Sequence, residues 1–306
     1  MSELVPVHPD APEWFRRRLE VPFTDEVVDV DGCPIHYLAW GERGRRGLVF
    51  VHGGGAHAHW WTHIAAAFAA EYRVVAIDLS GHGDSGRRDV YRFEQWTDEV
   101  IAVTAAAGIE GLPVVVGHSM GGFVTIATAA LHPEMVSGVV IVDSPVTEPD
   151  PEVEASRLKE AFGPRARTYP SVDEALLRFR TVPPQARYLD YVMDHVGRRS
   201  LRATDGGFSW KFDPHVFGQF GGGSIRGVAL PYLRRIVARF ALLRCENGLV
   251  TQDIGRFMYE ELGRVAPVVE LPEAGHHPML DEPLVLLTAL RALLADWDHS
   301  EPHRRR

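Results

Sequence analysis

The chain has 306 residues, of which 45% are hydrophobic and 24% are charged, close to the average of globular proteins. These proportions exclude a disordered chain, a collagen and a coiled coil. The formal net charge of −9 argues against nucleic acid or an anionic membrane as the main partner, because both are themselves negatively charged.

The chain has two cysteines, Cys33 and Cys245. They are too few for a disulfide framework or a zinc cluster, which fits a reducing cytoplasm. The N-terminus lacks the basic and apolar segments of a signal peptide. No run approaches the roughly 20 apolar residues that a membrane span needs. We therefore expect a cytoplasmic monomer or homodimer with no nucleic-acid or membrane partner.

Short β-branched segments alternate with amphipathic segments over the first 145 residues. Asp31 and Gly32 separate two strand-like segments and predict a hairpin. Gly108 follows a helical segment and predicts its C-terminal end. The predicted strands are 27–30, 35–40, 47–52, 73–79, 114–117 and 136–143, and the predicted helices are 60–70, 93–107 and 120–131. This alternation indicates an α/β fold with a doubly wound, mostly parallel sheet.

The alternation stops after Pro145. Residues 146–231 are rich in Pro, Gly, Arg and aromatic side chains and show no strand–helix repeat. Strands are again predicted at 240–244 and 265–271, and helices at 254–262 and 283–297. We predict a core formed by residues 1–145 and 232–306, and an inserted, mostly helical cap at 146–231.

The motif GHSMG, residues 117–121, lies between a predicted strand and a predicted helix. This position predicts a tight turn that exposes the Ser119 hydroxyl at the C-terminal edge of the sheet. Gly117 and Gly121 fit such a turn, because a Cβ would clash where strand and helix approach. The Met120 N–H, at the start of the helix, would face an anion. The alternative is an ordinary serine in a glycine-rich turn.

Two other loops follow predicted strands. The loop HGGGA begins at His52, and the N–H groups of Gly54 and Met120 are candidates for an oxyanion hole, although the loop could also be a simple connector. The loop AGHHPM contains His276, which we choose over His277 as the base that accepts the Ser119 proton. A serine hydroxyl is a weak nucleophile at neutral pH and needs such a base.

These motifs, with the segment from Asp78 to Gly86 between them, resemble those of the α/β-hydrolase superfamily in sequence and in order. The resemblance covers about residues 25–145 and 235–297. It implies a Ser–His–acid triad and a cap domain over the site. The resemblance in the cap is one of position only.

The acid of the triad departs from the common pattern. Many members of the superfamily place an aspartate in a turn after strand seven, where this chain has Gly248 at the expected position. Asp143, at the end of strand six, and Glu246, in the strand-seven turn, both fit the chain order Ser, acid, His. Some members, including certain haloalkane dehalogenases, carry the acid at the end of strand six. We favour Asp143, although a turn former before Pro145 is its ordinary alternative role.

Two other patterns suggest ligands. Residues 81–86 match G-x-G-x-x-G, but a polar loop follows them where a dinucleotide site needs a helix. His59 and His63 would share a helix face and could bind zinc, but no third ligand is evident, and we favour a structural role. We predict no cofactor and no metal.

The resemblance and the residues together predict a serine hydrolase, of the carboxylesterase class EC 3.1.1, that acts on a small molecule. It would cleave a carboxylic ester or lactone of an apolar compound through an acyl-enzyme. A carbon–carbon bond hydrolase or a cofactor-free perhydrolase could use the same triad, and a non-catalytic small-molecule receptor could use the same fold. Ser119 argues against dehalogenases and epoxide hydrolases, which resemble this family but have an aspartate as nucleophile.

Overall fold

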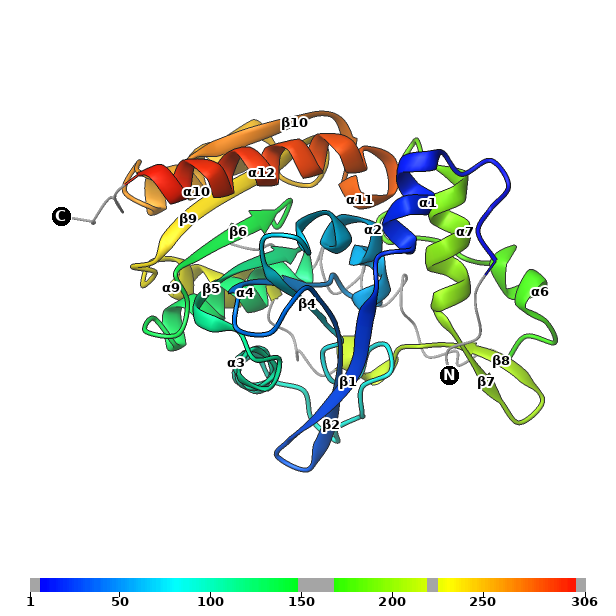
Figure 1. The fold of residues 1–306 in the computed structure, drawn as a ribbon. Helices are drawn as coiled ribbons and strands as arrows, with labels where there is room; N and C mark the ends of the chain where they lie inside the picture. The colour runs from blue at the N-terminus through cyan, green and yellow to red at the C-terminus, as the bar shows by residue number, and fades with distance from the viewer. Residues whose placement is uncertain (1–5, 148–167, 219–224, 301–306) are drawn as a thin grey trace.

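The computed structural model describes residues 6–147, 168–218 and 225–300. Eight strands form one sheet in the order β1-β2-β4-β3-β5-β6-β9-β10 (Figure 1). The pairs β1–β2 and β2–β4 are antiparallel, and the other five pairs are parallel. The strands are β1 (Phe23–Val30), β2 (Cys33–Trp40), β3 (Arg46–Val51), β4 (Arg73–Ile77), β5 (Glu110–His118), β6 (Gly138–Val142), β9 (Arg239–Asn247) and β10 (Val268–Gly275). The predicted doubly wound, mostly parallel sheet is confirmed.

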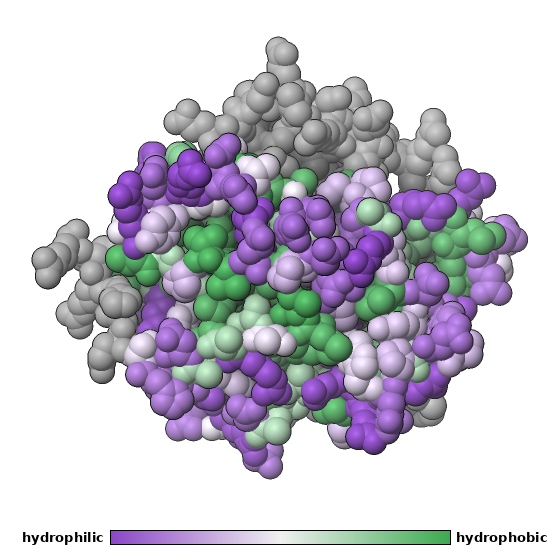
Figure 2. All heavy atoms as spheres, turned by 90° about the horizontal axis from the view of Figure 1, so that it is seen from above, coloured by the Kyte–Doolittle hydropathy of each residue, from purple (hydrophilic) through white to green (hydrophobic). Residues whose placement is uncertain are grey.

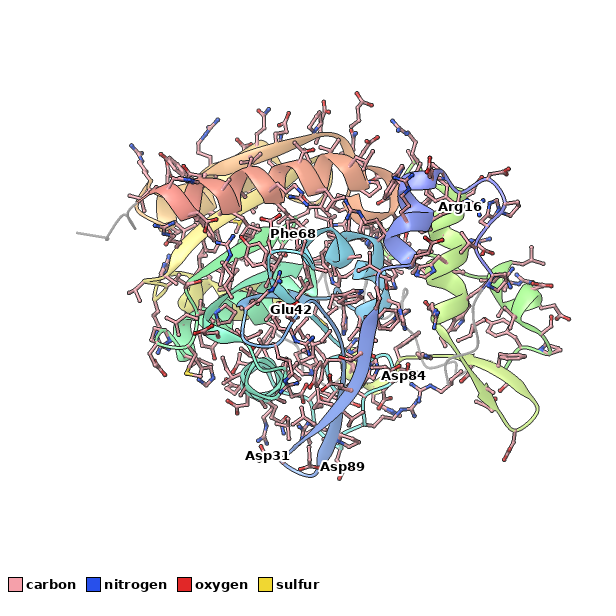
Figure 3. All side chains as sticks on the ribbon, viewed as in Figure 1. Arg16, Asp31, Glu42, Phe68, Asp84 and Asp89 are labelled. Atoms are coloured by element: carbon pink, nitrogen blue, oxygen red, sulfur yellow. The ribbon has the colours of Figure 1, made fainter. Side chains whose placement is uncertain are left out.

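The predicted hairpin joins β1 to β2. Asp31 and Gly32 have φ angles of 50° and 75°, the left-handed conformation that the tight turn between two twisted strands requires. Asp31 lies at the tip of this hairpin, away from the rest of the sheet (Figure 3).

Helices cover both faces of the sheet (Figure 1). On one face lie α3 (Phe93–Ala106), α4 (Met120–Leu131), α9 (Ile225–Leu233) and α10 (Gln252–Glu261). On the other lie α1 (Glu13–Leu19), η1 (Ala58–Trp61), α2 (Thr62–Ala65), η2 (Ala66–Phe68), α11 (Pro278–Asp281) and α12 (Pro283–His299). Along β3, Val49 and Val51 face the first layer while Leu48 and Phe50 face the second. Burial on both faces explains the continuous apolar run of this strand.

The predicted helix at 60–70 is instead a series of three short segments, η1, α2 and η2. The Thr62 hydroxyl donates to the His59 carbonyl at 3.2 Å, a local bond that competes with regular α-helical pairing. Trp61 and Phe68, from the two ends of the series, both pack on Phe50, with ring centroids 4.9 and 6.3 Å away.

The segment between β6 and β9 contains α6 (Val172–Leu176), α7 (Asp190–Arg199), β7 (Leu201–Thr204), β8 (Gly207–Trp210) and α8 (His215–Gly218). Helices α6, α7 and α8 fit the predicted helical character, but β7 and β8 form a hairpin that the sequence pattern did not predict. Residues 148–167 and 219–224 of the predicted cap lie outside the described residues. Helix α9 crosses the predicted boundary at 232 and packs on α4, and the boundary stays a prediction.

The face of the molecule that Figure 2 shows is mixed in character. Seen from above, hydrophobic side chains occupy the middle of this face and hydrophilic ones surround them (Figure 2).

Within the described part of the chain, no helix combines the length and the apolar character needed to span a membrane.

Candidate functional site

Three loops meet at the C-terminal edge of the parallel strands. Ser119 follows β5, Asp143 follows β6, and His276 follows β10. Parallel strands end at the same edge of a sheet, so side chains that are 157 and 133 residues from His276 in sequence reach its ring.

Ser119 lies on the strained turn that the glycine pattern predicted. Its φ and ψ angles are 54° and −120°, outside the regions that non-glycine residues favour. A Cβ on Gly117 would lie 2.3 Å from the Gly121 carbonyl oxygen, and a Cβ on Gly121 would lie 2.3 Å from the His52 carbonyl oxygen. Both glycines are therefore required by the close approach of strand and helix.

The ring of His276 lies between Ser119 and Asp143. Its Nε2 is 3.0 Å from Oγ of Ser119, and its Nδ1 is 2.8 Å from Oδ2 of Asp143. An ionised carboxylate only accepts hydrogen bonds, so Nδ1 carries the proton and Nε2 keeps its lone pair toward the serine hydroxyl. The side chains of His276 and Asp143 are 2% and 0% exposed, which shields this pair from competing water.

The Asp143 carboxylate is held by three backbone N–H groups in addition to His276. They belong to Cys245, Leu249 and Val250, at 3.2, 2.7 and 3.2 Å. Glu246, the other candidate acid, is exposed, and its carboxylate accepts the Glu273 N–H at 2.8 Å. The structure thus brings together Ser119, His276 and Asp143, while Glu246 is bound to a different partner.

The loop after β3 lies against Ser119. A Cβ on Gly53 would be 3.3 Å from the Ser119 Cβ. His52 holds this loop, because its Nδ1 donates to the Gly53 carbonyl at 2.7 Å and its Nε2 accepts the Leu79 N–H at 3.1 Å. Burial lowers the pKa of His52, which keeps the ring neutral as both bonds require.

The N–H groups of Gly54 and Met120 stay the predicted donors of an oxyanion hole. The Gly53 carbonyl and the Gly54 N–H belong to one trans peptide and point in opposite directions, so the bond from His52 also orients the Gly54 N–H. Met120 is the first residue of α4, and an N–H in the first helical turn has no partner within the helix.

Side chains that the sequence reasoning did not assign hold the loop around His276. His118 Nε2 donates to the His276 carbonyl at 2.7 Å, and Asp281 accepts the Gly275 N–H at 2.7 Å. Gln185, between α6 and α7, accepts the His277 N–H at 2.8 Å. Burial, and next the nearby His276, lower the pKa of His118 well below its ordinary value. The one available signal was the presence of His118 in GHSMG and of a second histidine, His277, in AGHH.

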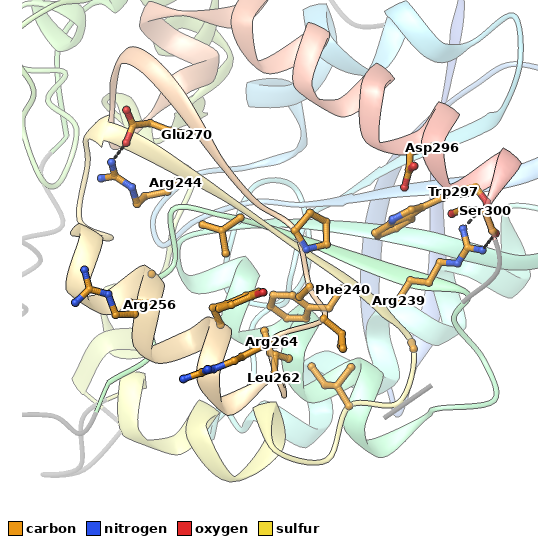
Figure 4. Close-up of a pocket in the computed structure, with 18 of the residues that line it drawn as sticks. Arg239, Phe240, Arg244, Arg256, Leu262, Arg264, Glu270, Asp296, Trp297 and Ser300 are labelled. Atoms are coloured by element: carbon orange, nitrogen blue, oxygen red, sulfur yellow. Dashed lines mark hydrogen bonds and ion pairs between the residues drawn. The ribbon is translucent and has the colours of Figure 1, made fainter. Parts of the chain in front are cut away.

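A separate cavity of about 770 Å³ lies between α10, α12 and the last two strands (Figure 4). Its lining includes the first residues of β9 and β10, so it extends to the end of these strands opposite the His276 loop. The Arg239 guanidinium donates to the carbonyls of Trp297 and Ser300, and Arg244 pairs with Glu270. Both guanidinium groups already have partners, and the cavity shares no lining residue with the Ser119 site.

The two other patterns of the sequence have structural explanations. Gly81 and Gly83 have φ angles of 82° and 56° in a turn, and no helix opens there as a dinucleotide site requires. His59 Nδ1 lies 3.2 Å from the Thr62 hydroxyl, and His63 Nε2 donates to the Met279 carbonyl at 2.8 Å. Among the described residues, two groups of three side chains could share a metal ion, and neither includes His59 or His63. They are His118, His276 and His277, and His36, Asp78 and Asp84.

Comparisons with known proteins agree with this architecture. A family model described as the alpha/beta hydrolase family matches residues 48–289. Esterase Rv0045c of Mycobacterium tuberculosis is 28% identical over 277 residues, which are 88% of this chain and 89% of that protein. The crystal structure of E-2-(acetamidomethylene)succinate hydrolase has a TM-score of 0.78, with 19% identity over 90% of this chain and 100% of that one. At this identity the structural match shows the fold alone.

A third relative matches over a shorter stretch. The 2-hydroxy-6-oxo-6-(2'-aminophenyl)hexa-2,4-dienoic acid hydrolase of Metapseudomonas resinovorans is 28% identical over 136 residues. These residues are 43% of this chain and 46% of that protein, less than half of its length.

Proposed function

Because this chain belongs to the alpha/beta hydrolase family, we propose that it is a serine hydrolase that cleaves a carboxylic ester or lactone of an apolar small molecule. The observation that carries the proposal is the pair of hydrogen bonds at His276, 3.0 Å to Ser119 and 2.8 Å to Asp143. The esterase of M. tuberculosis, which aligns over 88% of this chain, supports the ester as the bond that is cleaved.

In the first step, Ser119 Oγ attacks the carbonyl carbon of the ester while His276 Nε2 takes the hydroxyl proton. Asp143 accepts from Nδ1, so it fixes the tautomer that leaves Nε2 free of a proton and stabilises the imidazolium that forms. The carbonyl oxygen becomes an oxyanion, which the N–H groups of Gly54 and Met120 would bind. One such donor contributes about 10²–10³-fold in rate.

The tetrahedral intermediate then collapses. His276 gives its proton to the leaving alkoxide, the C–O bond breaks, and an acyl-enzyme remains on Ser119. A water molecule that loses a proton to His276 attacks the acyl carbon. The acid leaves, and the proton returns from His276 to Ser119 Oγ, which restores the starting state.

Aromatic rings connect the His276 loop to the cap, and they support an apolar substrate. The ring of Trp60 lies 5.5 Å from that of His277 and 6.4 Å from that of Phe179, and Phe179 lies 5.5 Å from Trp210. Such rings supply a large apolar surface next to a few polar groups, which is the usual character of a small-molecule site.

One relative favours a second candidate, a carbon–carbon bond hydrolase on the same three residues. The M. resinovorans hydrolase is named for a 2-hydroxy-6-oxo dienoic acid, a compound without an ester bond, so its hydrolysis must break another bond. Kinetics on esters, lactones and vinylogous diketones would distinguish the two candidates by which class is turned over.

The test of the proposal is ester hydrolysis by Ser119→Ala. We expect the wild type to hydrolyse p-nitrophenyl esters, with higher kcat/KM for longer or aromatic acyl groups, and Ser119→Ala to lose at least about 10³-fold. Ser137→Ala is the matched control, because this serine is exposed and its hydroxyl donates to the Pro113 carbonyl. Circular dichroism and melting curves check that each variant folds. Full activity of a folded Ser119→Ala variant would overturn the proposal.

A further inference from the structure

Three histidine rings lie together beneath Ser119. The ring of His276 is 4.8 Å from that of His118 and 4.6 Å from that of His277, centroid to centroid, and His118 and His277 are 5.3 Å apart. One ring nitrogen from each residue lies within 4.8 Å of the other two. All three residues are buried, with 1% to 4% of their surface exposed.

The hydrogen bonds leave one lone pair on each ring. His118 and His277 donate from Nε2, to the carbonyls of His276 at 2.7 Å and Pro183 at 3.2 Å, so Nδ1 of each has no proton. His276 carries its proton on Nδ1 and keeps its lone pair on Nε2. Within the described chain, Nδ1 of His277 is buried and has no hydrogen-bond partner. A buried acceptor without a hydrogen-bond partner is energetically costly, and a bound ligand would satisfy it.

From these rings we propose that His118, His276 and His277 form a site for a divalent transition-metal ion such as Zn²⁺, and that the bound ion inhibits the enzyme. Neutral imidazole is the ligand that Zn²⁺, Cu²⁺ and Ni²⁺ share in proteins. Zinc binds imidazole nitrogen at about 2.0–2.1 Å, which places two ligand nitrogens about 3.3 Å apart in a tetrahedral site. The ring nitrogens lie within 4.8 Å of one another, so the rings would have to turn toward the ion to reach this spacing, and water or the Ser119 hydroxyl would supply the fourth ligand.

The ion would act by taking the lone pair of the base. A metal-bound Nε2 of His276 cannot accept the Ser119 proton, so activity would fall in proportion to the occupied fraction. Ser119 is partly exposed, unlike the three histidines, so the ion would enter from the side of the serine. The inhibition rests on the proposed function, whereas the binding of the metal does not.

The experiment measures Zn²⁺ binding and inhibition on the same proteins. Isothermal titration calorimetry gives the stoichiometry and Kd, and each variant's ester hydrolysis is expressed relative to its own metal-free rate. The variants are His277→Gln and His118→Gln, because a glutamine amide can still donate from the position of Nε2 but has no imidazole lone pair. His215→Gln is the control, because this side chain is 80% exposed and lies on α8.

We expect one Zn²⁺ per wild-type chain and inhibition that follows occupancy. Both ligand variants should bind at least roughly tenfold more weakly, since even partners outside the ligand set typically contribute 10–100-fold to metal affinity. His215→Gln should match the wild type. Wild-type affinity and inhibition in His277→Gln would overturn the proposal, as would a wild type that binds no zinc. Zinc binding to a chain that hydrolyses none of the substrates would leave the metal site standing and refute the proposed function instead.

Discussion

A Cβ atom on Gly248 would lie 2.2 Å from Oδ2 of Asp143. The carboxylate of Asp143 therefore occupies the space that a side chain at position 248 would fill. This is the position at which the resemblance to the superfamily placed the expected aspartate. The glycine does not merely lack a carboxylate, because its missing side chain is what allows the acid from the end of β6 to reach His276.

This relationship predicts that Gly248→Ala lowers activity strongly. The added methyl group must displace the Asp143 carboxylate from His276, and we expect kcat/KM to fall by about 100-fold or more. Gly255→Ala is the control, because its nearest contact would be an ordinary 3.5 Å and it lies within α10. Equal activity of Gly248→Ala and Gly255→Ala would show that the carboxylate is not confined as described.

The same relationship predicts that the acid can be moved. Asp143→Ala should be nearly inactive, and the double variant Asp143→Ala with Gly248→Asp should regain at least about tenfold in kcat/KM, because the two positions share one space and their effects are not additive. Steady-state kinetics on one p-nitrophenyl ester compares the three proteins. A double variant no better than Asp143→Ala contradicts the expectation.

The two candidate acids are compared by replacing each carboxylate with its amide. Asp143→Asn should lower kcat by about 10⁴-fold, because an amide favours the wrong tautomer of His276. Glu246→Gln should stay within a few-fold of the wild type, since its oxygen can still accept the Glu273 N–H. The reverse ranking would assign the role to Glu246.

A buried ion pair away from Ser119 should make stability depend on pH. His36 Nδ1 lies 2.7 Å from Asp78 and its Nε2 lies 2.9 Å from Asp25. Burial opposes the charged ring, but the hydrogen bond and charge of Asp78 outweigh it and raise the pKa of His36 to about 9. Asp84, which also raises it, lies on the side of the sheet toward β7 and β8 (Figure 3).

A folded-state pKa above the unfolded value of about 6.5 means that the folded protein binds this proton more tightly. The stabilisation is therefore complete below pH 6.5 and is lost as the pH rises toward 9. Its full size is about 3 kcal/mol, from the difference between these two pKa values. Urea unfolding at about pH 6 and pH 9 should show a larger loss for the wild type than for His36→Gln. Parallel pH dependences would contradict the ion pair.

Much of the fold was predictable because local signals and tertiary contacts agree. The helix 120–131 has the predicted bounds, since Gly117 and Gly121 mark the turn and a mostly apolar run follows. The β7–β8 hairpin was missed because each strand has only four residues and most of them are partly exposed, so neither shows a clear two-residue period.

The supports of the His276 loop could not be predicted for a different reason. Gln185 bonds to the backbone of a residue 92 positions later, and His118 to one 158 positions later. Neither contact has a local pattern, because a side chain that binds a backbone group places no demand on its partner's identity. The contact of Asp143, and not Glu246, with His276 could be expected from the sequence because the glycine at 248 is visible there.

The reaction with a fluorophosphonate, followed by intact mass and peptide mapping, tests the central claim most directly, because the probe needs a serine activated by a neighbouring base. We predict one adduct per wild-type chain, located on Ser119, and no adduct on Ser119→Ala. Labelling of His276→Ala should be slower by orders of magnitude. An adduct on another side chain, or equal labelling rates for His276→Ala and the wild type, would contradict the pairing of Ser119 with His276.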